Sequence, residues 1–241
     1  MLQGILQGFK ALIFPDNCFC CRQFLNSGHH QQLCQACLSS LLPNTPPFCL
    51  KCSRHLDTPS PQGLCPTCIK TSYAFDQAWS ACIYNDRMQD LIHAFKYKGK
   101  TSLKKTFTEL LVQLIDRYHV PMDNFDMIIP IPLHPVRLRE RGYNQALLIA
   151  ELLSSTYTLP CHSNALERVK VTSTQTALEA KQRWTNMEGA FRINNHSTVA
   201  DKSILIVDDL LTTGATAHAA AVTLKEAGAA YIGILTVAIT K

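Results

Sequence analysis

The stretch that most constrains the fold is residues 203–220, which read SILIVDDLLTTGATAHAA. The four apolar residues 204–207 predict a strand that is buried on both faces of a parallel sheet. Two carboxylates, Asp208 and Asp209, close that run, and a turn of threonine and glycine leads into an alanine-rich helix that reaches Ala227. This order predicts an α/β domain with a ligand site at the carboxyl end of the strand.

The turn after the two acids has the composition of an anion site. It consists of Thr212, Thr213, Gly214, Ala215 and Thr216, and is called the Thr/Gly turn below. In such a loop backbone N–H groups converge on one spot, and the start of the next helix adds about half a positive charge there. A phosphate suits that spot, while the carboxylates would repel it and suit sugar hydroxyls or a metal ion beside it. An ordinary turn with an N-capping threonine is the alternative.

This stretch resembles the phosphoribosyl-pyrophosphate (PRPP) signature of type I phosphoribosyltransferases, in which an apolar strand, two acids and a TTGxT loop follow one another. The resemblance implies that Asp208 and Asp209 hold the ribose hydroxyls, that the Thr/Gly turn cradles the 5-phosphate, and that Mg²⁺ binds together with PRPP. A receiver domain can also open with a strand that ends in two aspartates. In a receiver that strand comes first, whereas only about 30 residues follow it here.

Eight of the eleven cysteines form four C-x2-C pairs: Cys18/Cys21, Cys34/Cys37, Cys49/Cys52 and Cys65/Cys68. Twelve residues separate the first pair from the second and the third from the fourth, and an offset of 31 residues relates the two halves, so the segment is an internal repeat. Two such pairs can place four thiolates around one tetrahedral zinc ion. Because no ligand position is missing, we expect two structural Zn²⁺ sites.

Two points about these cysteines stay open at this stage. Sequential pairing joins the first pair with the second and the third with the fourth through short loops, while a cross-braced pairing would join the first with the third. Disulfides are the alternative to zinc, but the chain shows no secretion signal, and thiols stay reduced in a cytosol. We therefore expect a cytoplasmic protein with a zinc-ribbon module over residues 1–71, opened by an amphipathic helix, and a second domain over 72–241.

The middle of the chain alternates predicted strands and helices. We expect strands at 75–84, 126–132, 160–166 and 231–238, and helices at 88–98, 102–118 and 144–155. None of these stretches approaches the roughly 18 apolar residues that a membrane span needs. Between residues 91 and 105 the chain has no acid and five lysines, Lys96, Lys98, Lys100, Lys104 and Lys105. They form either a solvated surface or a patch that faces phosphate.

Two further segments carry candidate binding residues. The loop at 133–145 contains Arg137, Arg139, Arg141 and Gly142; guanidinium groups bind pyrophosphate through paired hydrogen bonds, and a glycine lets the backbone come close. In the type I resemblance it occupies the pyrophosphate-loop position, and a basic surface turn is the alternative. Residues 168–183 are polar, as a mobile loop would be. The resemblance implies that this loop closes over the site, with Arg168, Lys170, Gln175 and Arg183 as its candidate binding residues. An inert surface loop is the alternative.

Taken together, four C-x2-C pairs, the segment PIPLHPVRLRERGYNQ and the segment VDDLLTTGAT resemble the ComF family of competence proteins. The resemblance implies a type I phosphoribosyltransferase-like parallel sheet flanked by helices, joined to an N-terminal four-cysteine zinc-ribbon module. It also implies a role in natural transformation, with PRPP or another phosphorylated ribose, single-stranded DNA and a competence helicase or translocation protein as partners. The alternatives are an active phosphoribosyltransferase with an unidentified acceptor in nucleotide metabolism and a zinc scaffold for a DNA-translocation partner.

Overall fold

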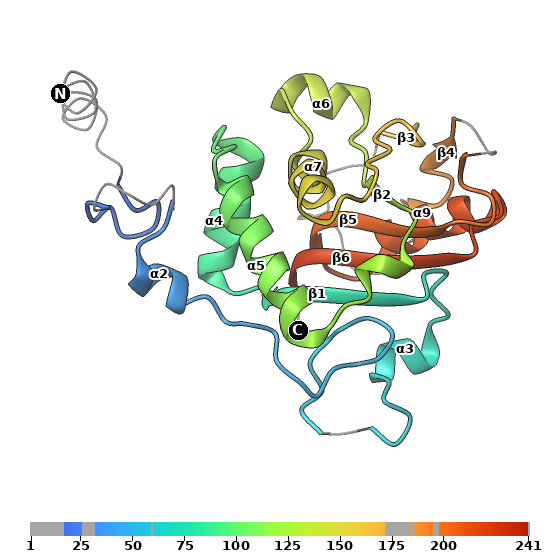
Figure 1. The fold of residues 1–241 in the computed structure, drawn as a ribbon, viewed down its shortest axis with the longest axis horizontal. Coiled ribbons are helices and arrows are strands. Elements are labelled where there is room, and N and C mark those ends of the chain that lie inside the picture. The colour runs from blue at the N-terminus through green and yellow to red at the C-terminus, as the bar shows by residue number, and fades with distance from the viewer. Residues whose placement is uncertain are drawn as a thin grey trace.

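The computed structural model describes residues 17–25, 32–58, 60–171, 184, 187–194 and 198–240. Its centre is a parallel sheet with the strand order β1-β6-β5-β2 (Figure 1). The strands of this sheet are β1 (Gln77–Ile83), β2 (Met127–Pro130), β5 (Ser203–Leu211) and β6 (Tyr231–Ile239). A short antiparallel pair, β3 (Leu166–Arg168) and β4 (Phe191–Ile193), stands apart from it.

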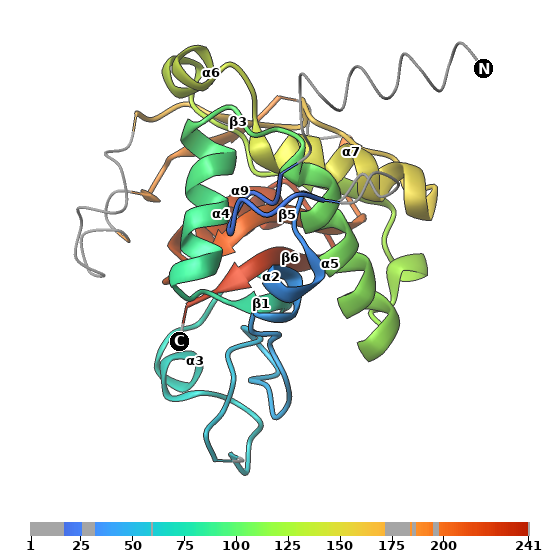
Figure 2. The same cartoon turned by 90° about the vertical axis from the view of Figure 1, so that its left-hand side faces the viewer.

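Helices cover both faces of the sheet (Figures 1 and 2). Helices α4 (Asp86–Tyr97), α5 (Leu103–Tyr118) and α7 (Gln145–Tyr157) pack on one face, and α9 (Ala215–Glu226) packs on the other with β3 and β4. In β5, the side chains of Leu205 and Val207 pack in the core beneath α4, α5 and α7, while those of Ile204 and Ile206 pack in the core on the side of α9. All four are fully buried. Burial on both faces is the reason that this strand reads as an unbroken apolar run.

The cysteine-rich segment, which consists of the described residues between 17 and 71 and is called the zinc-ribbon segment below, covers the outer edge of β1. The N–H of Ile83 donates to the carbonyl of Leu42 (2.8 Å), and the N–H of Ala78 donates to the carbonyl of Lys51 (2.9 Å). In the other direction, the N–H of Asn44 donates to β1 at 2.9 Å. These bonds satisfy backbone groups that an uncovered edge strand would offer to other chains.

The zinc-ribbon segment itself contains two short helices, α2 (Gln35–Ser39) and α3 (Pro66–Lys70). The expected boundary at residue 71 stays a prediction, and the expected amphipathic helix at the start of the chain lies outside the described residues. Within the described part of the chain, no helix combines the length and the apolar character needed to cross a membrane.

The predicted elements around the sheet are confirmed with two corrections. The strand predicted at 160–166 is wrong: Cys161 makes a single parallel bridge to Ile128, and the next strand, β3, begins at Leu166 and pairs with β4 instead. The arginine-rich segment predicted as a loop contains a helix, α6 (Pro135–Arg141). Proline in the first turn and Gly142 at the end, with a φ of 82°, are the standard signals for starting and ending such a helix. A 3₁₀ turn, η1 (Met122–Asn124), precedes β2.

Candidate functional site

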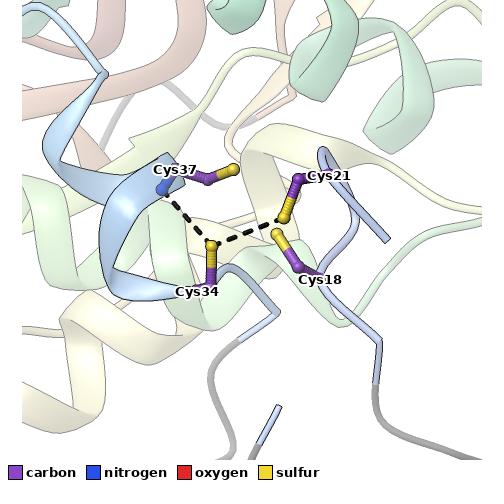
Figure 3. Close-up of side chains that lie close together, drawn as sticks. All are labelled: Cys18, Cys21, Cys34 and Cys37. Carbon is purple, nitrogen blue, oxygen red and sulfur yellow. Dashed lines mark hydrogen bonds between the residues drawn. The ribbon is translucent and has the colours of Figure 1, made fainter. Parts of the chain in front are cut away.

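The eight paired cysteines form two clusters. The first cluster is Cys18, Cys21, Cys34 and Cys37 (Figure 3), and the second cluster is Cys49, Cys52, Cys65 and Cys68. Within each cluster, the four sulfur atoms all lie within 4.8 Å of one another. The sequential pairing is therefore the one that the chain adopts, and none of the eleven cysteines forms a disulfide.

The geometry of both clusters fits a tetrahedral metal ion. The sulfur atoms of Cys21 and Cys34 lie 3.5 Å apart, and those of Cys52 and Cys65 lie 3.7 Å apart. Zinc–sulfur bonds of about 2.3 Å in a tetrahedron place neighbouring sulfurs roughly 3.8 Å apart. All four positions around each centre belong to cysteine, which is the pattern of a structural zinc site.

The acidic pair lies inside β5 and not beyond its end, because the pairing with β6 continues through Asp208 and as far as Leu211. The side chain of Asp209 is 5% exposed, and Lys96 of α4 places its Nζ atom 2.7 Å from the Asp209 carboxylate. Asp208 turns its carboxylate onto its neighbour and accepts a hydrogen bond from the Asp209 N–H at 2.8 Å. The two acids thus have different surroundings, since among the described residues only Asp209 has a direct ion pair.

Burial raises the pKa of Asp208 to about 7, and the charge of Asp209 adds to that rise, while Lys96 and Arg168 oppose it. For Lys96, burial by itself lowers the pKa, but the two carboxylates outweigh it, so that its pKa ends above the ordinary lysine value. The ammonium group is therefore charged, and Asp208 changes its charge near neutral pH.

One arginine, Arg168 of β3, acts directly on the charge of Asp208, and two arginines of α6 act on the cations that surround the acidic pair. The charges of Asp208, Arg137 and Arg141 all affect Arg168, whose pKa is lowered by burial, and Arg141 also acts on Lys96. Beside this group is a cavity of about 120 Å³, lined by Lys96, Tyr97, Gly99, Arg137, Glu140 and Arg141. Motifs about 30 to 110 residues apart in the sequence thus meet at one place.

Within this cavity, the cationic groups are held in place by neighbours. Arg137 forms an ion pair with Glu140 at 2.8 Å. Arg141 donates to the side chain of Gln145 at 2.7 Å, and its guanidinium lies over the ring of Tyr97, 4.9 Å from its centre. Arg139 is exposed and does not line this cavity, and the same holds for Gly142.

The Thr/Gly turn connects β5 to α9. Gly214 caps the helix with a φ of 79°, and the N–H of Ala215 donates to the Thr213 hydroxyl at 3.4 Å. The cavity beneath the turn, which Asp208 and Thr216 also line, measures about 10 Å³. That is room for about one water molecule, so a phosphate bound at this turn would lie outside the cavity, on the outer side of the turn.

The mobile-loop candidates separate into two groups. Arg168 belongs to β3, and its guanidinium donates to the sulfur of Met187 at 3.4 Å. The ammonium of Lys170 donates to the carbonyl of Glu188 at 3.3 Å. Gln175 and Arg183 lie outside the described residues.

Sequence reasoning missed the partner of Asp209. The run of five lysines left open whether any of them faced the site, and the structure turns Lys96 inward while Lys98, Lys100 and Lys105 are exposed. One signal was present: Lys96 follows the buried Ile92 by four residues, which places the two on the same face of α4.

Comparison with known proteins agrees with this architecture. The double zinc ribbon domain family matches residues 9–69, and the phosphoribosyl transferase domain family matches residues 145–241. Competence protein F of Haemophilus influenzae is 30% identical over 225 residues, which cover 92% of this chain and 96% of that protein. Competence protein ComFC of Bacillus subtilis is 30% identical over 206 residues, which cover 83% of this chain and 80% of that protein. DNA utilization protein YhgH of Salmonella typhimurium is 28% identical over 225 residues, which cover 92% of this chain and 96% of that protein. On its own architecture and on this similarity along nearly its whole length, the chain belongs to the ComF family of competence proteins.

Proposed function

We propose that the chain binds PRPP, or another phosphorylated ribose, at the carboxyl end of β5 and handles single-stranded DNA in the cytoplasm during natural transformation. The observation that supports it is that Asp208 and Asp209 interact with Lys96 of α4 and Arg168 of β3, and that the charges of α6 act on these two cations in turn. An acidic pair for sugar hydroxyls, cations for phosphate and a helix N-terminus for a second phosphate are the groups that such a ligand requires.

Each group has a definite role in this proposal. The two aspartates accept hydrogen bonds from the ribose hydroxyls, the outer side of the Thr/Gly turn holds the 5-phosphate, and Arg137 and Arg141 neutralise the pyrophosphate. Asp209 already accepts from Lys96, so Asp208 is the carboxylate with more capacity for a ligand. Mg²⁺ bound with PRPP supplies further neutralisation of the pyrophosphate, and a carboxylate oxygen of Asp208 is a ligand of the type it prefers.

Calorimetric titration with PRPP and Mg²⁺ tests the sugar-phosphate site. We expect saturable binding by the zinc-loaded chain and an affinity at least tenfold lower in Asp208→Asn, which keeps the shape of the side chain but removes its charge. Asp123→Asn, an exposed aspartate in η1, is the matched control and should bind as the unmodified chain does. No binding by the unmodified chain, or equal binding by both variants, would refute the proposal.

The DNA-handling part is supported by the relatives, which are called competence proteins and a DNA utilization protein, and by a net charge of +5. Lys98, Lys100 and Lys105 are exposed and suit contacts with a phosphate backbone. Fluorescence anisotropy with a labelled single-stranded oligonucleotide should show binding that weakens as salt rises. Changing the three lysines to glutamine should reduce the salt dependence, whereas Asp208→Asn should leave DNA binding unchanged.

Two other functions predict different results. An active phosphoribosyltransferase would consume PRPP and release pyrophosphate, with single-stranded DNA absent or present as acceptor. A zinc scaffold for a translocation protein would bind neither PRPP nor DNA.

A further inference from the structure

An arginine of the zinc-ribbon segment, Arg54, donates a hydrogen bond to the backbone of the Thr/Gly turn. The guanidinium of Arg54 donates through Nη2 to the carbonyl of Thr212 at 3.1 Å and through Nε to the carbonyl of Thr240 at 3.3 Å. Its remaining nitrogen, Nη1, lies 3.5 Å from the hydroxyl of Thr67. One rigid cation therefore joins the turn, the end of β6 and the zinc-ribbon segment.

A tyrosine supports the next residue of the turn. The hydroxyl of Tyr73 donates to the carbonyl of Thr213 at 2.8 Å, and burial raises the pKa of Tyr73 to about 12, so the hydroxyl keeps its proton. The ring of Tyr73 lies against Gly214, where an added Cβ atom would come within 2.6 Å of it. Beside it, the N–H of Ala74 donates to Nδ1 of His218 on α9 at 3.0 Å.

Arg54 is tied directly to the second cluster, and Tyr73 belongs to the core against which Cys68 of that cluster packs. Arg54 follows Cys52 by two residues, and its carbonyl accepts a hydrogen bond from the N–H of Cys49 at 2.8 Å. Thr67, its side-chain partner, lies between Cys65 and Cys68. A metal ion held by these four cysteines fixes both chain segments that hold the guanidinium in place.

The first cluster is attached elsewhere. Cys18 and Cys37 belong to the core that α4 and α5 form against the sheet, and Arg87 of α4 donates to the sulfur of Cys37 at 3.3 Å. The two clusters are related by an internal repeat, yet they support different parts of the protein. This difference provides a matched comparison between them.

The hydrogen bonds to the carbonyls of Thr212 and Thr213 also orient N–H groups on the opposite side of the turn. A peptide unit is planar and trans, so its N–H points away from its carbonyl. Fixing the carbonyl of Thr212 therefore orients the N–H of Thr213, and fixing the carbonyl of Thr213 orients the N–H of Gly214. Both N–H groups are directed away from Arg54 and Tyr73, toward the side of the turn where an anion can bind.

We propose that the second cluster, acting through Arg54 and Tyr73, positions the Thr/Gly turn for phosphate, so that occupancy of this cluster, and not of the first, controls the affinity for a phosphorylated ligand. The affinity part of this inference rests on the proposed function. Arg54 and Tyr73 are positioning residues in it, because they contact the backbone of the turn and not the ligand.

The test compares Arg54→Ala, Arg54→Lys and Tyr73→Phe with the control Arg87→Ala, which removes the arginine beside the first cluster. All four are measured for bound zinc, for PRPP affinity by calorimetry with Mg²⁺, and for hydrogen exchange at the amides of residues 213–217. We expect unchanged zinc in all four. PRPP affinity should fall about tenfold in Arg54→Ala and about threefold in Tyr73→Phe. Arg54→Lys should recover part of the loss, because lysine keeps the charge but lacks the planar fork.

The metal itself provides a second comparison, Cys65→Ser against Cys34→Ser. Each should lose one zinc ion, and only Cys65→Ser should speed exchange in the turn and weaken PRPP binding. If Cys65→Ser does not fold, the Arg54 and Tyr73 variants still decide the matter.

The outcomes separate the two proposals. If the unmodified chain does not bind PRPP, the proposed function fails, while faster exchange of the turn in Arg54→Ala but not in Arg87→Ala still supports the positioning role. If the unmodified chain binds PRPP and Arg54→Ala matches it in affinity and exchange, the inference is overturned. Equal effects of Arg54→Ala and Arg87→Ala would also overturn it, because they would show a general loss of stability.

Discussion

Replacing Lys96 with methionine removes the cation beside the acidic pair while nearly keeping the length of the side chain. At an effective dielectric constant of about 20, the charges of Lys96 and Asp209 at 2.7 Å attract each other by roughly 6 kcal/mol before desolvation is counted. Loss of one partner of a buried ion pair costs about 3–5 kcal/mol. Because the Lys96 side chain is 22% exposed, we expect the lower end of that range at pH 8, about 3 kcal/mol.

The stability lost in Lys96→Met should be larger at high pH than at low pH. The folded-state pKa of Asp208 is raised to about 7, so its contribution to stability is full below the unfolded pKa and is lost as the pH rises through about 7. Lys96 opposes that rise, and without it the pKa of Asp208 lies higher still. At pH 6 the variant can bind protons to relieve the repulsion between its carboxylates, so the loss should fall to about 1–2 kcal/mol.

Thermal unfolding at pH 6 and pH 8, with bound zinc measured at both, checks this expectation. For a chain of this size 1 kcal/mol corresponds to about 2–4 °C in Tm, so Lys96→Met should lower Tm by about 6–12 °C at pH 8 and by clearly less at pH 6. Lys105→Met, the same change at an exposed position of α5, should shift Tm little at either pH. A loss for Lys96→Met that is equal at both pH values, or no larger than that of Lys105→Met, would refute the reasoning.

Three further expectations follow from the packing and the clusters. Gly214→Ala should cost more stability than Gly189→Ala. Both glycines have a positive φ (79° and 63°), but only Gly214 has the Tyr73 ring against it. Urea unfolding should show a loss in the free energy of unfolding of about 1 kcal/mol from the backbone in each variant and of about 1–3 kcal/mol more in Gly214→Ala. Gly233→Ala in β6 should also destabilise by about 1–3 kcal/mol, because its Cβ would come within 2.6 Å of Phe125, and a Tm equal to that of the unmodified chain would contradict this. Elemental analysis of the purified chain should find two zinc ions, and a content of one would show that a four-cysteine cluster does not hold metal.

The sequence predicted those features that short segments determine. Cysteine spacing identified both sets of ligands, although only the folded chain decided between sequential and cross-braced pairing. An apolar run on each side of the Thr/Gly turn predicted β5 and α9, because burial on two faces and helix propensity both act within one element. The length of β5 was predicted less well: Asp208 and Asp209 read as the end of a strand, but pairing with β6 carries the strand past them to Leu211.

The missed features depend on contacts between distant segments. Lys96 was one of five lysines until the fold placed it against Asp209, more than a hundred residues later in the chain. The predicted strand at 160–166 failed because pairing with β2 stops after one bridge, which the apolar character of the segment does not reveal. Arg54 had no distinguishing pattern at all, since a lone arginine between two cysteine pairs reads as a surface residue.

The zinc-ribbon segment contacts the sheet and the site in three separate ways, and the two clusters take part in different ones. It covers the backbone of β1 at the sheet edge, it shares a core with α4 and α5 through the first cluster, and it holds the Thr/Gly turn through the second. A segment this short cannot build a large hydrophobic core of its own, and a four-cysteine metal site supplies folding free energy directly. The second cluster has a small core of its own, with Leu56 as its buried aliphatic side chain, so a metal ion bound by its four cysteines would contribute strongly to fixing the loop that carries Arg54.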